Sequence, residues 1–198
     1  VLPVVMALLR EVYAAGSPWA KYIRYLPQRH LDVINMNEDE AKAAHLHRSW
    51  FDHMSIMKSI HSALQTVCEE QPAVFGKGNC PDIFLTRWAL SIVWSRAFKG
   101  RARKHRGDLA IIPVADSLNH AHTSSSSRPL AHQWCNLTED QLPPPTSPFF
   151  VSDSALAYCL IAQDDYKAGD ELFIDYGLNC NAEILATYGF VALDGHHD

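Results

Sequence analysis

The sequence lacks the features that mark several broad classes of protein. Its longest apolar run, residues 1–9, is far shorter than the ~20 residues that a membrane-spanning helix needs. It has no sustained block of Lys and Arg, and its 17 basic and 22 acidic residues give a formal net charge of −5. That balance gives no reason to expect nucleic-acid binding. These absences predict a protein that binds neither a membrane nor nucleic acid.

Cysteine pairs of the C-x-x-C type are absent as well. The five cysteines are widely spaced and odd in number, which is not typical of a disulfide framework. We therefore expect free thiols, most of them buried, in a reducing compartment. The eleven histidines include no pair at the spacing of known zinc motifs, so we expect no metal site.

The sequence does contain enough apolar residues for a packed core. It is 47% hydrophobic and 10% aromatic, which excludes wholesale disorder. Apolar residues at three- and four-residue steps predict helices over 2–15, over 39–70 and from 81 or 82 to about 98. A short helix is also expected from Ser17-Pro18 to Leu26, with Ser17 as its N-cap and with Trp19, Tyr22 and Ile23 on one side.

Short strands are predicted in the second half of the chain. The apolar runs at 109–114, 155–163 and 171–175 are typical of strands. Residues 123–148 contain serine and proline runs without periodicity, so we expect a mobile surface loop there. A final short helix is expected from about Asn181 to just before Gly189. Helices first and short strands later indicate the α+β class.

Three polar motifs stand out in this second half. One strand leads into a group of Asp116, Asn119 and His120, which an ordinary turn closed by an Asx hydrogen bond would also explain. Another strand ends at Tyr176, directly before a glycine, and the final helix ends in Tyr188, again before a glycine. Each tyrosine alone is more often a core aromatic. The three motifs in this order are more specific than any one of them.

In this order the motifs resemble those of the SET-domain protein methyltransferases. The branch they resemble is that of the plant Rubisco large-subunit lysine methyltransferase. The resemblance rests on Asp116-x-x-Asn119-His120, on Ala168-Gly-Asp-Glu-Leu-x-Ile-x-Tyr176-Gly and on Asn181-Ala-Glu followed by Tyr188-Gly-Phe. It implies a partial SET-domain β-fold with a large helical insertion.

Two earlier segments agree with the resemblance. Ser17-Pro-Trp-Ala-x-Tyr-Ile-x-x-Leu-Pro27 is similar to the segment that opens the branch's helical insertion, and Ser95-Arg-Ala-Phe98 is similar to the one that closes it. The resemblance thus implies a single partial SET domain over 1–198. Within it, the helical insertion would span about 28–98 and the C-terminal SET core 99–198.

The resemblance also implies roles for single residues. Asn119 and His120 would hold S-adenosylmethionine, chiefly by its adenine and amino-acid portions, and Arg96 would bind the cofactor too. Tyr176 would be the catalytic tyrosine at the methyl-transfer centre. The substrate-binding positions would be Ser95, Asp116 and Tyr188. For Asp116, a role in orienting the amine and a role in anchoring the turn at Asn119 both stay open.

Methyl transfer explains why a tyrosine suits this position. The accepting nitrogen must be neutral, whereas the ordinary pKa of a lysine is ~10.4. A narrow aromatic channel removes water from the ammonium group, and a nearby sulfonium charge repels it; both effects lower that pKa. Tyr176 would orient the amine through its hydroxyl group and would not need to ionise.

One motif of the family is absent from this chain. The family carries a Gly-x-Gly segment whose backbone clasps the methionine end of the cofactor. Gly76-Lys-Gly78 has that spelling but lies in the helical region, so we expect it to be a loop. The missing segment would lie upstream of Val1. The chain by itself would then carry about half of the cofactor site.

The resemblance implies a protein-lysine N-methyltransferase that uses S-adenosylmethionine and acts on a histone or another protein. Two alternatives stay open. One is protein-histidine methylation, which a member of this branch performs on actin. The other is a catalytically silent module whose helical insertion docks a partner protein. Members of this type act in the chloroplast, nucleus or cytoplasm, so we expect an intracellular protein.

Overall fold

The computed structural model describes residues 1–99, 109–121, 128–136, 156–177 and 180–191. The chain folds as two compact units. The first, which we call the helical unit, comprises Val1–Asp116 and Leu178–Asp198; the second, the strand unit, comprises Ser117–Gly177.

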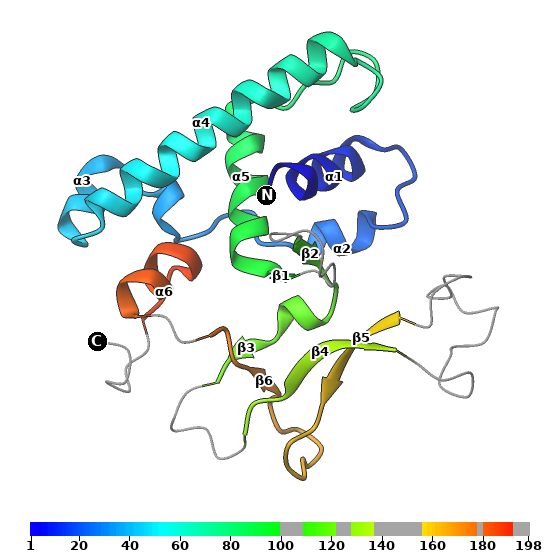
Figure 1. Cartoon of the computed structure of the whole chain (residues 1–198), viewed down its shortest axis with the longest axis vertical. Helices are drawn as coiled ribbons and strands as arrows, with labels where there is room; N and C mark the ends of the chain where they lie inside the picture. The colour runs from blue at the N-terminus through cyan, green and yellow to red at the C-terminus, as the bar shows by residue number, and fades with distance from the viewer. Residues whose placement is uncertain (100–108, 122–127, 137–155, 178–179, 192–198) are drawn as a thin grey trace. The chain divides into compact units, whose positions relative to one another are not determined.

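Most of the helical unit is α-helix (Figure 1). Its described helices are α1 (Leu2–Tyr13), α2 (Ala20–Tyr25), α3 (Glu38–Ala43), α4 (His47–Glu70), α5 (Ile83–Arg96) and α6 (Asn181–Tyr188). It also contains the 3-10 helix η1 (Val33–Asn35), the first two residues of the 3-10 helix η2 (Ala115–Ser117) and the antiparallel strands β1 (Ala97–Lys99) and β2 (Leu109–Ile111). The α5 helix packs against both α1 and α4 (Figure 1). The helices predicted at the two ends of the chain are confirmed.

The core of the helical unit is formed by apolar side chains, most of them from α1, α4 and α5. They are Val5, Leu8, Leu9, Leu26, Ile34, Met57, Ile60, Leu64, Phe75, Ala89, Leu90, Ile92 and Val93. Removing this much apolar surface from water is the main force that holds such a unit together. Trp88 and Trp94 are partly buried and pack against the same cluster.

Three helix boundaries differ from the prediction. The stretch 39–70 is two helices, because the backbone turns at His45, whose φ is 57°. The α5 helix stops at Arg96, since the next three residues pair with β2 instead. Ser17 does not cap α2, which begins only at Ala20. Its hydroxyl group instead accepts a hydrogen bond from the Trp19 backbone N–H at 3.1 Å.

The strand unit consists of two small pairs of strands. The short strands β3 (Asn119–His120) and β6 (Phe173–Ile174) are parallel, and β4 (Ala131–Asn136) and β5 (Leu156–Ile161) are antiparallel. The strands predicted at 155–163 and 171–175 are confirmed as β5 and β6, both shorter than expected.

The strand β4 corrects the prediction of a mobile loop over 123–148. Residues 131–136 pair with β5 in full register, and Trp134 packs edge-on against Tyr158 with ring centroids 5.2 Å apart. Cross-strand aromatic pairs of this kind stabilise a ladder whose own sequence has no clear alternation. Apart from 128–136, the expected loop lies outside the described residues.

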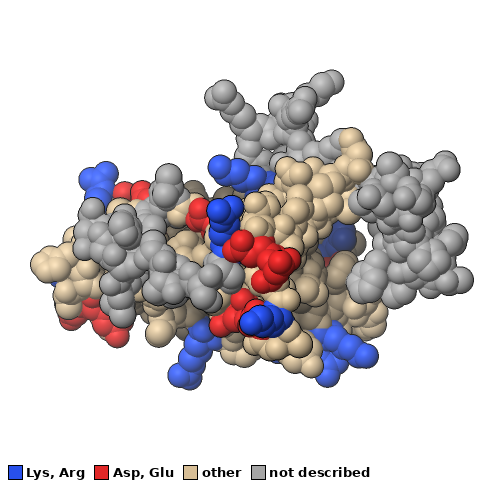
Figure 2. Space-filling model, turned by 90° about the horizontal axis from the view of Figure 1, so that it is seen from below, with Lys and Arg blue, Asp and Glu red and all other residues tan. Residues whose placement is uncertain are grey.

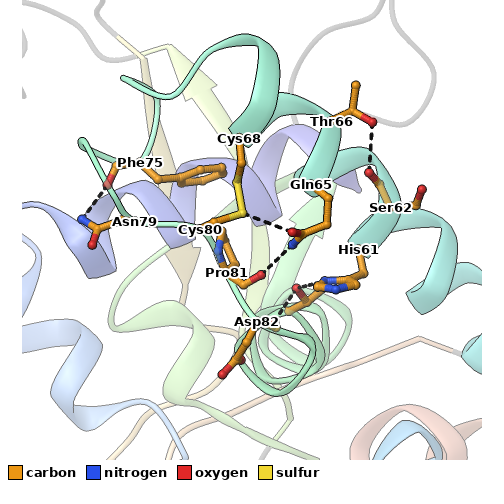
Figure 3. The surroundings of a disulfide bond; sticks show 11 residues. His61, Ser62, Gln65, Thr66, Cys68, Phe75, Asn79, Cys80, Pro81 and Asp82 are labelled. Atoms are coloured by element: carbon orange, nitrogen blue, oxygen red, sulfur yellow. Dashed lines mark hydrogen bonds between the residues drawn. A yellow bond between two sulfur atoms is a disulfide. The ribbon is translucent and has the colours of Figure 1, made fainter.

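The expectation of free thiols throughout is wrong for one pair. Cys68, near the end of α4, and Cys80, just before α5, form a disulfide across 12 residues (Figure 3). Sequence spacing alone did not reveal it, because the two cysteines meet only when α4 and α5 pack side by side. The inference of a reducing compartment loses its basis with this bond. Cys135, Cys159 and Cys180 are free.

Charged side chains of both signs are intermingled on the face drawn in Figure 2. Lys42 with Glu38 and Arg48 with Asp52 form ion pairs one helical turn apart.

None of the described helices is long and apolar enough to cross a membrane. In the part of the chain that the structure describes, no group of three or more His, Cys, Asp or Glu side chains is placed to hold a metal ion.

Candidate functional site

The strand unit brings together three of the predicted site residues. Asn119 and His120 form β3, which lies beside β6, and Tyr176 follows β6 by two residues. The register places His120 opposite Ile174. Parallel pairing therefore brings Asn119 and His120 of the first motif and Tyr176 of the second to one edge of the strand unit.

Tyr176 is tied to β3 and its flank at both its backbone and its side chain. Its backbone N–H donates to Nδ1 of His120 at 3.2 Å, and its hydroxyl group donates to the carbonyl oxygen of Leu118 at 2.7 Å. The centroids of the His120 and Tyr176 rings lie 5.2 Å apart, and His120 is buried. Because Nδ1 accepts, a neutral His120 carries its proton on Nε2. The Tyr176 hydroxyl group gives its proton to Leu118 and keeps its oxygen as an acceptor.

Asn119 is held by Glu171, a residue to which the sequence motifs assigned no role. The side-chain amide nitrogen of Asn119 donates to Oε1 of Glu171 at 2.6 Å. Glu171 belongs to the Gly-Asp-Glu-Leu part of the second motif, so the motif itself carried the signal. Since Asn119 is exposed and its donor faces Glu171, its amide carbonyl oxygen is the group left to accept from a ligand.

In the helical unit, Arg96 and Asp116 form a second cluster of predicted site residues. Arg96 is the last residue of α5, and its Nη1 donates to the backbone oxygen of Asp116 at 2.9 Å. The same nitrogen lies 3.5 Å from the Oδ2 of the Asp116 side chain. That side chain is 1% exposed and that of Arg96 23% exposed, so water screens the pair weakly.

Tyr22 completes this cluster, although its spacing predicted only an apolar position of a helix. Its hydroxyl group donates to Oδ2 of Asp116 at 2.5 Å. Burial, followed by the bond and the negative charge of Asp116, raises the pKa of Tyr22 well above its ordinary value. Tyr22 is therefore a neutral donor. Its place in the Ser17–Pro27 segment was the available signal.

The other two predicted residues, Ser95 and Tyr188, also lie in the helical unit. Ser95 uses its hydroxyl group to donate to the backbone oxygen of Ser91 at 2.8 Å, one turn back along α5. Tyr188 ends α6, its ring centroid lies 6.1 Å from that of Phe190, and burial raises its pKa.

The helical unit contains a separate buried polar group around Asp32. Its carboxylate accepts hydrogen bonds from the Ser91 hydroxyl group and, at 2.6 Å, from the Asn35 amide. Burial raises the pKa of Asp32, although both bonds oppose the shift. Burial lowers the pKa of the neighbouring His30. No sequence motif marks this group, because its members come from η1, its flanks and α5.

Each of the two clusters, taken by itself, offers polar groups of the kind that bind a polar, charged ligand such as S-adenosylmethionine. In the helical unit, Oδ1 of Asp116 and Nε of Arg96 are buried without a hydrogen-bond partner, and buried polar atoms normally have one. In the strand unit, the Asn119 amide offers an acceptor. Acceptors and donors of this kind match the hydroxyl, amine and carboxylate groups of such a molecule.

Comparison with known proteins identifies relatives along nearly the whole chain. No protein-family model matches the sequence. The Rubisco large-subunit N-methyltransferase of Nicotiana tabacum is 29% identical over 96% of this chain. The actin-histidine N-methyltransferase of Danio rerio is 28% identical and the fructose-bisphosphate aldolase-lysine N-methyltransferase of Arabidopsis thaliana 26%, over 96% and 95% of the chain.

Solved structures of a related enzyme have a fold similar to that of this chain. The SET domain of the Rubisco methyltransferase bound to lysine and S-adenosylhomocysteine has a TM-score of 0.71 over 94% of this chain and 40% of its own, at 23% identity. The same enzyme bound to S-adenosylmethionine has a TM-score of 0.65 over 98% of this chain and 40% of its own, also at 23% identity. The chain is similar in sequence to the Rubisco large-subunit N-methyltransferase, and it shares the fold of that enzyme's SET domain.

These similarities confirm the predicted resemblance and the predicted fold class. The chain has the mixed helix-and-strand fold of that SET domain. It spans 36% of the length of the tobacco relative and 29% of the zebrafish relative. The predicted division at residues 28–98 and 99–198 stays a prediction, as do the roles of the seven candidate site residues.

Proposed function

We propose that the chain is part of an S-adenosylmethionine-dependent protein N-methyltransferase whose acceptor is a lysine side chain. The observation that carries the proposal is the joint placement of Asn119, His120 and Tyr176 at one edge of the strand unit. One relative that is named as a lysine N-methyltransferase supports the acceptor. The partner in this proposal is a protein.

Each cluster has a part in the proposed reaction. Asn119, His120 and Arg96 bind the cofactor, which supplies a methyl group on a positively charged sulfur. Tyr176 donates its own proton to Leu118, so its oxygen can act as an acceptor for the amine of the substrate. This contact fixes the direction of the nitrogen lone pair. Holding two reactants in a near-attack geometry can contribute ~7–11 kcal/mol to the barrier reduction in favourable cases.

The variant Tyr176→Phe tests this role. In the full-length natural protein we expect turnover to fall by about a hundredfold or more, the scale of one preorganised polar group at a reacting centre. The Kd for S-adenosylmethionine should stay within about threefold, because the tyrosine acts on the amine. Tritium transfer from labelled cofactor gives the turnover, and calorimetry gives the Kd.

Tyr166→Phe is the matched control. Tyr166 lies in the same unit, and its hydroxyl group also donates to a backbone carbonyl oxygen at 2.7 Å, that of Arg128. Its loss should leave turnover unchanged. Full turnover in Tyr176→Phe, or an equal loss in both variants, would contradict a special role for Tyr176.

Histidine is the second candidate acceptor, because actin-histidine methyltransferases are 27–28% identical over 96% of this chain. Purified actin and purified fructose-bisphosphate aldolase, each incubated with the full-length protein and labelled cofactor, separate the two. Mass spectrometry then locates the methyl group. A methylated lysine supports the proposal, and a methylated histidine without lysine transfer replaces it with the second candidate.

A further inference from the structure

The Tyr22 hydroxyl group has a geometry that a core tyrosine does not need. It reaches from α2 to the buried Asp116, 94 positions away, and ends 2.5 Å from Oδ2. Short bonds from a neutral donor to a carboxylate are among the stronger hydrogen bonds in proteins. Tyr22 and Arg96 thus hold Asp116 from two different helices.

The contacts of Asp116 divide its atoms by role. Oδ2 receives Tyr22 and lies near Arg96, and the backbone oxygen receives Arg96. The backbone N–H donates to Ile112 at 3.0 Å. Oδ1 is buried and has no partner. A buried carboxylate oxygen without a partner is costly unless a ligand supplies the missing donor.

We propose that Tyr22 is a positioning residue of the methyltransferase site: it fixes the Asp116 carboxylate and, through it, the Arg96 guanidinium. Oδ1 of Asp116 and Nε of Arg96 are then presented to the ligands in one fixed arrangement. This inference rests on the proposed function. It adds a residue from the Ser17–Pro27 segment, whose spacing alone predicted no functional role for it.

Without the Tyr22 hydroxyl group, the carboxylate is free to rotate. Oδ1 and Oδ2 then exchange places, and the weak 3.5 Å contact to Arg96 is the one side-chain bond left among those the structure shows. A polar pair that is no longer fixed must be ordered again each time a ligand binds. That ordering lowers affinity and the fraction of productive complexes.

The variant Tyr22→Phe in the full-length natural protein tests the inference. We expect kcat/KM for methyl transfer to fall by about tenfold to a hundredfold, the usual range for one hydrogen bond to a charged group. Combining Tyr22→Phe with Asp116→Asn should cause no further loss beyond Asp116→Asn alone, because the hydroxyl group acts through the carboxylate. Tyr25→Phe is the control on the same helix: its side chain is 88% exposed, and kcat/KM should not change.

The variant Trp88→Phe serves as the reference for a residue that only stabilises the fold, and it separates such a role from the proposed positioning role of Tyr22. That variant removes another long-range bond of the helical unit, from Trp88 Nε1 to the Pro27 carbonyl oxygen at 2.8 Å. It should lower the Tm while leaving kcat and KM unchanged. If Tyr22→Phe lowers the Tm in the same way and also leaves kcat and KM unchanged, the inference is overturned. The inference is also overturned if the double variant loses as much kcat/KM as Tyr22→Phe and Asp116→Asn lose together.

Failure of the proposed function has a different signature. In that case the wild-type protein itself gives no heat with S-adenosylmethionine in calorimetry, and the inference falls with it. Alternatively, the wild-type protein binds S-adenosylmethionine and transfers methyl groups, and Tyr22→Phe equals it in both binding and transfer. In that case the proposed function stands and only the positioning role of Tyr22 is wrong.

Discussion

The helical unit and the strand unit differ in the interactions that stabilise each of them internally. The helical unit has an apolar core drawn mainly from three helices, closed by a disulfide. Of the described residues of the strand unit, the buried ones are Leu130, Ile174 and the polar His120. The β4–β5 ladder and the hydrogen bonds of Asn119 and Tyr176 connect its described strands. The described part of the strand unit therefore depends more on hydrogen bonds than on buried apolar surface.

This difference explains why a ligand should act mainly on the strand unit. Regions with few buried apolar contacts open at low free-energy cost, and a ligand that binds only the closed form stabilises them by mass action. Arg96 and Asp116 lie in the helical unit, which has the larger cluster of buried apolar side chains. We expect hydrogen exchange to be slow in α4 and α5 and faster in β3 and β6.

The largest expected effect comes from truncating the helical core. Leu64 is fully buried in α4, so Leu64→Ala should lower the free energy of unfolding by about 3–5 kcal/mol, through lost burial and the cavity left behind. Leu160 of the strand unit is 36% exposed, so Leu160→Ala should cost well under 2 kcal/mol, the low end of such changes. Chemical denaturation measures the free energy of unfolding of both variants, and equal losses would contradict the contrast between the two units.

Reduction of the disulfide should have the next largest effect. A bond that closes a loop of about this length typically stabilises a protein by about 2–4 kcal/mol. Dithiothreitol, or the double variant Cys68→Ser with Cys80→Ser, should lower the Tm and speed hydrogen exchange between α4 and α5. The double variant itself should not respond to dithiothreitol. An unchanged Tm in both would show that the packing around Gln65 in Figure 3 holds this segment without the bond.

A smaller effect is expected at the end of α6. Gly189 has a φ of 79°, and a Cβ added there would lie 2.8 Å from the backbone of Leu31. Gly16 has the same φ with nothing within 4 Å, which makes it a matched control. Gly16→Ala should cost about 1–2 kcal/mol for the left-handed backbone alone. Gly189→Ala should cost more. Equal losses from the two variants would mean that the contact with Leu31 relaxes freely.

The smallest effect concerns the pH dependence of the helical unit. Burial lowers the pKa of His30 below its ordinary 6.5, so the folded state favours the neutral ring. Stability from this group is complete above about pH 6.5 and is lost as the pH falls from there toward the folded pKa. His30→Gln should flatten that decline, measured as the free energy of unfolding from about pH 8 to about pH 5. Identical slopes for variant and wild type would contradict the assignment.

Local features could be predicted well from the sequence and long-range pairings poorly. Apolar spacing located α1, and the order of the three polar motifs pointed to Asn119 and Tyr176 as members of one site. The strand β4 was missed, because its partner β5 supplies the order that its own residues do not show. The disulfide was missed for a related reason: the packing of α4 against α5 brings its two cysteines together.

The same limit applies to the site. Glu171 lay inside a recognised motif, and its contact with Asn119 follows once β3 and β6 are paired. Tyr22 lay in a recognised segment too, but its contact with Asp116 spans 94 positions. Neither spacing nor composition encodes such a contact, because it depends on where α2 is placed by the core.

The most direct test of the proposed cofactor site is a calorimetric titration with S-adenosylmethionine. The full-length natural protein and its variant Asn119→Ala would be measured side by side. We expect saturable binding by the full-length protein, weakened about tenfold or more in Asn119→Ala, where one hydrogen-bonding group is lost. No binding by the full-length protein, or equal binding by the variant, would contradict the proposed site.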